Sequence, residues 1–296
     1  MKTEIIPLDT RQVAELARHD VELALAEDVG HGDLTANLID RAKVARARIV
    51  AREDAVLCGQ PWVKAALTAL DPKVHLTWHL EEGQRCSANQ TVLEMQGSAR
   101  ALLTAERTAL NFLQLLSAVA TKTAQYVAAI QGTGTQIVDT RKTLPGLRLA
   151  QKYAVRMGGG VNHRIGLFDA ILIKENHIAA AGGVAQVLAK AKGHSAGASF
   201  IQIEVETLEQ LREALEHEAT MVLLDNMDLP TLRAAVELNR TLGAPRKMGP
   251  AILEISGGVT LDGLRALAET GVDRISIGTL TKDIRATDFS MRFDAL

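Results

Sequence analysis

The second half of the chain alternates short apolar segments with helical ones, and this alternation constrains the fold more than any other feature. Strand-like runs recur from residue 135 onward, at intervals of roughly 20–30 residues. Repeated βα units of this kind predict parallel strands that form an α/β barrel. The expected strands are 136–140, 169–174, 199–205, 220–225, 250–256 and 272–277, and the helices between them are clearest at 208–218, 229–242 and 261–269.

The first half of the chain has a different pattern. Its longest helical period runs over 104–130, which is long for one helix, so we expect a break near Ser117 or Thr121. The other expected elements are a helix at 10–28, strands within 46–59 and 73–86, and a helix at 61–70 that Pro61 opens.

Composition excludes several classes of protein. The 296 residues carry a net charge of −2 and only 3% aromatic residues, which argues against binding nucleic acid. The sequence shows neither an apolar run long enough for a membrane span nor a signal peptide, so we expect no membrane association. Cys58 and Cys86 lack the spacing of a metal site, which favours reduced thiols in a cytoplasmic protein.

Positive side chains gather where the first two βα strands end. Arg141 and Lys142 follow the first strand, Lys174 follows the second, and His163 and Arg164 come after three glycines between them. In α/β barrels the working groups lie at the carboxyl ends of the strands. We therefore expect this cluster to bind two or more anionic groups, by positioning and electrostatic stabilisation.

Glycines directly follow two of the later strands. Ser256, Gly257 and Gly258 lie after a strand and before a helix, where the glycines allow close backbone approach and the helix start offers free N–H groups. Gly278 follows the last strand and is expected to supply a second wall. Phosphate sites recur at the last strands of such barrels, so this pair of turns is predicted to bind phosphate.

Carboxylates end the two middle strands. Glu204 and Asp225 lie on strands expected to be neighbours, where they could hold Mg²⁺, directly or through water, or bind sugar hydroxyls. No set of His and Cys ligands accompanies them, which argues against zinc. Lys174 could in principle form a Schiff base, so a sugar-phosphate or aldolase-type barrel enzyme stays open on the residues alone.

Long motifs of the chain resemble the quinolinate phosphoribosyltransferase family, also called carboxylating nicotinate-nucleotide pyrophosphorylases. The resemblance runs almost end to end and in the same order. Its motifs are ERTALNFLQLLSAVAT (106–121), DTRKTLPGLR (139–148), GGGVNHRIGLFDAILIKENHI (158–178), IQIEVET (201–207), LLDNM (223–227), EISGG (254–258) and GTLTKD (278–283).

The resemblance implies an N-terminal α/β sandwich and a C-terminal, incompletely closed α/β barrel of parallel strands. The sandwich would comprise 1–116 together with a returning tail, 281–296, and the barrel 117–280. It implies a homodimer in which the partner's N-terminal domain completes each barrel mouth. The implied reaction joins quinolinate to 5-phosphoribosyl-1-pyrophosphate (PRPP) with Mg²⁺, giving nicotinate mononucleotide, pyrophosphate and CO₂ for de novo NAD synthesis.

The resemblance also assigns residue roles. Quinolinate would be bound by Thr140, Arg141, His163, Arg164 and Lys174, with Arg107 contributed from the other subunit. Lys142, Ser256, Gly257, Gly258 and Gly278 would bind PRPP, with Lys142, Glu204 and Asp225 as the catalytic set and the two carboxylates near the metal.

Two positions depart from the family pattern, and three alternatives remain. Ala118 stands where many members have Gly, and Lys282 where many have His. The alternatives are a related phosphoribosyltransferase with another acceptor, the Schiff-base or sugar-phosphate barrel enzyme, and an anion-binding module without turnover. The cationic cluster favours a dicarboxylate acceptor.

Overall fold

The computed structural model describes residues 9–294, which form two compact units. Within the described residues, the N-terminal unit comprises 9–124, 143–159 and 280–294, and the barrel unit comprises 125–142 and 160–279. Segment 143–159 thus returns to the N-terminal unit from between two strands of the barrel unit. The domain limits that the resemblance implies, 116/117 and 280/281, stay predictions.

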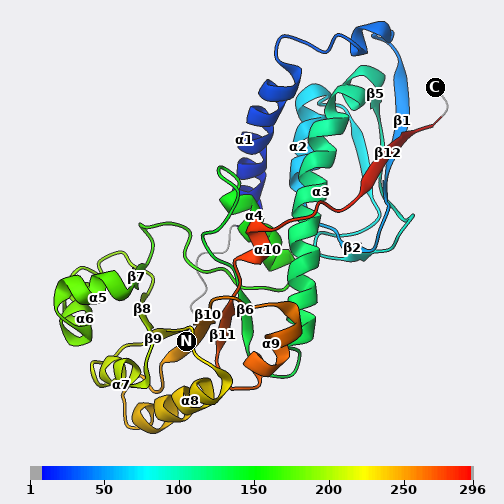
Figure 1. Cartoon of the computed structure of the whole chain (residues 1–296). Helices are drawn as coiled ribbons and strands as arrows, with labels where there is room; N and C mark the ends of the chain where they lie inside the picture. Colours follow the sequence, from blue (N-terminus) through cyan, green and yellow to red (C-terminus); the bar gives the residue numbers. More distant parts are fainter. Residues whose placement is uncertain (1–8, 295–296) are drawn as a thin grey trace. The chain divides into compact units, whose positions relative to one another are not determined.

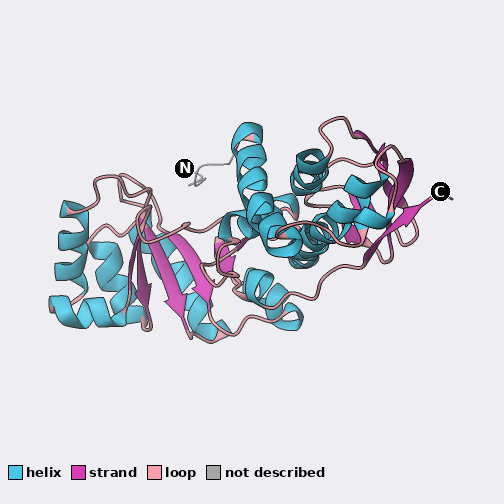
Figure 2. Ribbon diagram, turned by 90° about the horizontal axis from the view of Figure 1, so that it is seen from above, coloured by secondary structure: helices cyan, strands magenta, loops and turns pink. Residues whose placement is uncertain are grey.

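The barrel unit is built on a six-stranded parallel sheet (Figures 1 and 2). The strands follow the order β6-β11-β10-β9-β8-β7, and in residues 9–294 no ladder joins the end strands β6 and β7. The sheet is therefore an open barrel, and all six predicted strands are confirmed. Their bounds are β6 Gln136–Val138, β7 Ile171–Ile173, β8 Ile201–Val205, β9 Met221–Asp225, β10 Ile252–Ser256 and β11 Arg274–Ser276.

Helices follow the strands of this sheet, as the alternation predicts. One face of the sheet is apolar: Ile203, Val222, Leu224 and Ile275 are fully buried. The neighbouring positions along each strand point to the opposite face. The helices are α5 Glu175–Ala181, α6 Val184–Gly193, α7 Leu208–Glu216, α8 Leu229–Gly243 and α9 Leu261–Ala268.

The opposite face of the sheet is polar. Register places Glu204 beside Leu223, Leu223 beside Glu254, and Glu254 beside Arg274, so these side chains share one face. Asp225 and Ser256 pair two residues further along their strands, also on this face, at the carboxyl ends of β9 and β10. This face, which lines the interior of the open barrel, thus carries several ionisable groups beside the apolar Leu223.

The N-terminal unit contains a four-stranded antiparallel sheet in the order β12-β1-β5-β3. Strand β12 lies near the end of the chain and pairs with β1, with Ile49 opposite Met291. Its strands are β1 Val44–Ala51, β3 His75–Trp78, β5 Thr91–Ser98 and β12 Phe289–Phe293, and a separate ribbon pairs β2 Ala55–Val56 with β4 Arg85–Cys86.

Helices of this unit pack around a buried tryptophan. Trp62 stacks on Phe112 at 6.4 Å between ring centroids and also contacts Tyr153, while its indole N–H donates to Asp20 at 2.9 Å. These contacts join four helices around one ring. The helices are α1 Thr10–Val29, α2 Gln60–Leu70, α3 Ala99–Ala129 and α4 Arg148–Met157; a short 3₁₀ turn, η1, spans Ala36–Leu38, and α10 spans Thr279–Lys282.

Helix α3 runs without interruption for 31 residues, so the expected break near Ser117 or Thr121 is wrong. The hydroxyls at these two positions bind the segment around β2. Ser117 accepts from the Cys58 N–H and donates to the Cys58 carbonyl, and Thr121 accepts from the Val56 N–H at 2.8 Å. None of the described helices, α3 included, is both long and apolar enough for a membrane crossing.

We predict that Gly158→Ala destabilises the protein by about 1–3 kcal/mol, because overpacking a close contact strains both partners. Gly158 caps α4 with an ordinary φ of −80°, but an added Cβ would overlap the Ala120 carbonyl oxygen and lie 2.6 Å from Thr123 Cβ. Urea unfolding measures the loss. Gly193→Ala is the matched control, since an added Cβ there meets no atom of the described residues within 4 Å; equal effects would contradict the close contact.

Candidate active site

Two arginines face the same small region of the barrel unit. Arg164 is 8% exposed, and its guanidinium donates to the Ala170 carbonyl at 3.1 Å. Burial lowers the pKa of Arg164, and the nearby positive charge of Arg141 lowers it further, with Asp169 opposing. Two cations held together at partial burial disfavour each other. An anion bound between them would offset both the cost of burying the Arg164 charge and the repulsion between the two arginines.

Carboxylates anchor the segment that carries Arg164. Asp139, fully buried at the end of β6, accepts from the His163 N–H at 2.8 Å and from the Asn162 amide at 2.6 Å. Asp169 closes the following loop by accepting from the Ile165 and Gly166 N–H groups. These charge-assisted bonds fix the backbone on both sides of the arginine.

His163 points into the barrel interior. Its Nδ1 accepts from the Arg164 N–H at 2.8 Å, so a neutral ring carries its proton on Nε2 and donates to Gln202 Oε1, also at 2.8 Å. The ring meets Phe200 edge-on at 5.3 Å. These contacts hold the Arg164 backbone, and direct contact of His163 with quinolinate stays a prediction.

An acidic pair lies at the carboxyl ends of β8 and β9. Lys174 Nζ lies 3.8 Å from Glu204 Oε2. Burial raises the pKa of Glu204; the charge of Lys174 lowers it, and the charge of Asp225 raises it. The two carboxylates are therefore close enough to repel each other, and a cation between them would be favoured.

This acidic pair fits Mg²⁺ of the kind that phosphate substrates carry. Magnesium is usually bound by one or two carboxylates together with substrate phosphates, rather than by a cage of protein ligands. Glu204 and Asp225 supply two oxygen donors, and residues 9–294 contain no group of three or more His, Cys, Asp or Glu side chains suited to a metal.

The loop after β10 has the shape expected for binding an anion. Gly257 and Gly258 have φ of +95° and +55°, the left-handed region that favours glycine. Thr260, before α9, makes no side-chain capping bond, so the N–H groups of the first turn are not capped by it. An added Cβ on Gly257 would lie 3.5 Å from Asp225 Oδ1, which places the loop beside the acidic pair.

Thr140, Lys142 and Gly278 form another close group. The Lys142 N–H donates to the Thr140 hydroxyl at 3.0 Å. A Cβ added at Gly278 would lie 2.9 Å from Lys142 Cδ and 3.5 Å from the Thr140 oxygen. Glycine at this position thus leaves room for the lysine side chain. Lys142 itself is exposed at the strand end, where it can reach a bound anion.

Sequence reasoning missed three residues below the site. Gln202 and Glu254 are fully buried and Arg274 is 3% exposed, all on the polar face of the sheet. Glu254 Oε1 lies 3.6 Å from His163 Nε2, and Glu254 Oε2 lies 3.8 Å from Arg274 Nε. Alternation along β8 places Gln202 on the same face as Glu204, and alternation along β10 places Glu254 on the same face as Ser256. This pattern in the sequence could have indicated both residues.

Comparison with protein families matches both units. The family model described as "Quinolinate phosphoribosyl transferase, C-terminal domain" matches residues 119–292, and the model of the corresponding N-terminal domain matches residues 33–117. The chain belongs to the quinolinate phosphoribosyltransferase family. The fold predicted by the resemblance, an N-terminal α/β domain with an open α/β barrel, is confirmed.

Individual members of the family are similar over nearly the whole chain. The nicotinate-nucleotide pyrophosphorylase [carboxylating] of Mycobacterium leprae is 41% identical, covering 94% of this chain and 97% of its own. The "Probable nicotinate-nucleotide pyrophosphorylase [carboxylating]" of Bacillus subtilis is 40% identical, with 90% and 89% covered. The solved nicotinate-nucleotide pyrophosphorylase of Francisella tularensis superposes with a TM-score of 0.90 at 41% identity, covering 99% of each chain.

Arg107 is the predicted family residue that lies in the N-terminal unit, exposed on α3.

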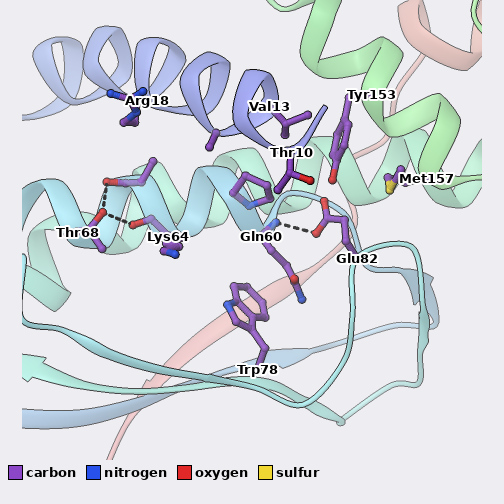
Figure 3. Close-up of a pocket in the computed structure, with 13 residues that line it drawn as sticks. Thr10, Val13, Arg18, Gln60, Lys64, Thr68, Trp78, Glu82, Tyr153 and Met157 are labelled. Carbon is purple, nitrogen blue, oxygen red and sulfur yellow. Dashed lines mark hydrogen bonds between the residues drawn. The ribbon is translucent and has the colours of Figure 1, made fainter. Parts of the chain in front are cut away.

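A pocket of about 670 Å³ is also found in the N-terminal unit, lined by α1, α2 and α4 (Figure 3). At one end of it Glu82 accepts from the Gln60 N–H and lies beside Tyr153. None of the residues lining this pocket is among the predicted substrate residues.

We predict opposite shifts of the Glu204 pKa when its neighbours change. Asp225→Asn removes a like charge and lowers this pKa, whereas Lys174→Gln removes a positive charge and raises it. Carbon-13 NMR titration of labelled glutamates measures both, with Glu204→Gln giving the assignment. Glu237→Gln on α8, where Glu237 pairs with Arg240, is the control and leaves the value unchanged. Shifts of the same sign in both variants would contradict the described pairing.

Proposed function

We propose that this chain transfers the phosphoribosyl group of PRPP to quinolinate with decarboxylation, giving nicotinate mononucleotide, pyrophosphate and CO₂ in NAD biosynthesis. Family membership over almost the whole chain supports the reaction. The observation that carries it at the site is the pair of neighbouring arginines, which suits a dianion, beside an acidic pair and a glycine turn, which suit a phosphoribosyl donor with its metal.

Quinolinate binds at the cationic side of the site. Arg141 and Arg164 meet its two carboxylates, since guanidinium groups bind carboxylates through paired N–H donors. Lys174 and Thr140 complete this side, and His163 acts here or through the Arg164 backbone. Binding the dianion offsets the repulsion that the two arginines exert on each other.

PRPP binds at the glycine-lined side. Ser256, Gly257 and Gly258 receive its 5-phosphate through backbone N–H groups, with Gly278 as the second wall. Lys142 reaches the pyrophosphate. Glu204 and Asp225 would hold Mg²⁺, directly or through water, and the metal would supply charge neutralisation of the leaving pyrophosphate.

The reaction needs positioning more than acid–base chemistry. The unprotonated pyridine nitrogen attacks the anomeric carbon as the bond to pyrophosphate breaks, through a state with positive charge on the ribose. Glu204 or Asp225 stabilises that charge, and Lys142 stabilises the leaving group. The quaternised nitrogen then favours loss of the adjacent carboxylate as CO₂, because the electron pair left on carbon lies beside a cation.

We further propose a homodimer in which Arg107 serves the neighbouring subunit's site, and a cytoplasmic location. The first proposal is supported by the exposure of Arg107 on α3 and by the resemblance. The second is supported by two buried free thiols, the usual state of cysteines in reducing compartments.

A direct assay tests the reaction. The protein is incubated with quinolinate, PRPP and Mg²⁺, and CO₂ and nicotinate mononucleotide are measured. We expect both products in equal amounts. Nicotinate in place of quinolinate tests the acceptor, and product formation only with nicotinate would overturn the proposal in favour of a related transferase.

We predict that Arg164→Ala lowers kcat/KM for quinolinate by about 100-fold or more, because it removes a charged group aimed at the substrate. The fold survives, since the change also removes the cost of burying one cation beside another. Circular dichroism and steady-state kinetics measure the two effects. Arg240→Ala, an exposed α8 arginine paired with Glu237, is the control. Near-normal turnover by Arg164→Ala would contradict the assignment.

A mixing experiment tests the shared site. Arg107→Ala and Arg164→Ala chains are each inactive, but a mixed dimer contains one site with both arginines intact. Random co-assembly is expected to restore about a quarter of the wild-type activity. Each variant mixed with itself is the control. Activity no higher than the sum of the two separate variants would mean that Arg107 acts within its own chain.

A further inference from the structure

A glutamate and an arginine face each other inside the barrel, one layer below the substrate residues. Register places Glu254 on β10 directly beside Arg274 on β11. Glu254 is fully buried, Arg274 is 3% exposed, and Arg274 Nε lies 3.8 Å from Glu254 Oε2. Neither residue belongs to the roles assigned above.

Stability alone does not account for this pair. Removing two charges from water is costly, and apolar residues of similar volume are often as stable or more so. Among residues 9–294, neither carboxylate oxygen of Glu254 finds a hydrogen-bond partner, and the same holds for Nε and Nη2 of Arg274. The pair is therefore poorly compensated as a purely structural element.

Glu254 is connected to the substrate residues through His163. Its Oε1 lies 3.6 Å from His163 Nε2, which also meets Gln202 Oε1 at 2.8 Å. A carboxylate on this side favours the proton on Nε2. The opposite nitrogen, Nδ1, then carries no proton and accepts the N–H of Arg164 at 2.8 Å. With the proton on Nδ1 instead, two donors would face each other and the Arg164 backbone would have to move.

We propose that Glu254 and Arg274 are positioning residues for Arg164. Glu254 holds the His163 ring and its Nε2–H tautomer, and Arg274 holds the Glu254 side chain in place from the neighbouring strand. The inference rests on the proposed role of Arg164 in binding quinolinate. Changing the buried pair should therefore weaken the binding of quinolinate and leave the binding of PRPP unchanged.

The test replaces the pair by apolar side chains of similar length. In Glu254→Met/Arg274→Met the protein stays folded, and KM for quinolinate rises about tenfold, since small displacements of a binding group are costly. KM for PRPP stays within about twofold. Nitrogen-15 NMR shows the Nδ1–H tautomer of His163 appearing in the variant. The single variant Glu254→Gln is expected to give the same KM split.

The control separates positioning from loss of stability. Asn239 is buried and bonds both the N–H and the carbonyl of Ala251, which joins α8 to the start of β10. Asn239→Ala lowers Tm but leaves KM for quinolinate unchanged at a temperature where the variant is folded.

Three outcomes decide the inference. If the folded double variant keeps a wild-type KM for quinolinate and a wild-type His163 tautomer, the pair is structural and the inference is wrong. If neither the double variant nor Glu254→Gln folds, the pair is a folding requirement and the inference is also wrong. If the wild-type protein does not convert quinolinate, the proposed function fails, and this result is distinct from the other two.

Discussion

The mutual repulsion of Arg141 and Arg164 is the interaction on which the site depends. Both lie in a partly buried region, and the charge of one lowers the pKa of the other. Such an arrangement costs stability unless an anion binds, so the surrounding chain must hold it in place. Asp139 and Asp169 do this, by accepting backbone N–H groups on either side of Arg164.

The two faces of the parallel sheet divide the work between stability and function. The apolar face is fully buried, with residues such as Ile203, Val222 and Leu224. The polar face carries the acidic pair and, below it, the Glu254–Arg274 pair. Burial of charge on this face opposes folding, because desolvation raises the pKa of Glu204. Stability from Glu204 is therefore present at low pH and is lost as pH rises through its raised pKa. Metal or substrate binding would offset that loss.

The alternating pattern was sufficient to predict all six barrel strands, because a buried parallel strand must be short, apolar and followed by a helix. Strand-end positions likewise pointed to Arg141, Lys174 and Glu204, since the carboxyl ends of parallel strands share one edge. Register adds the neighbouring pairs, such as Asp225 beside Ser256.

Other features could not be predicted from local pattern. A break in α3 was expected from the length of its helical period, but Ser117 and Thr121 bind a segment about sixty residues earlier, a long-range contact with no local signal. The inward direction of His163 depends on Gln202 and Glu254, which belong to two other strands. Periodicity assigns a side chain to a face, whereas its partners come from the packing of the whole unit.

The most direct measurement of the central claim is the change in Tm on adding ligand, measured by scanning calorimetry. If two repelling arginines form the acceptor site, quinolinate, with two carboxylates, stabilises the protein far more than nicotinate, with one, at the same concentration. We expect a clear rise in Tm with quinolinate and little change with nicotinate. Equal shifts with both ligands, or none with either, would contradict it.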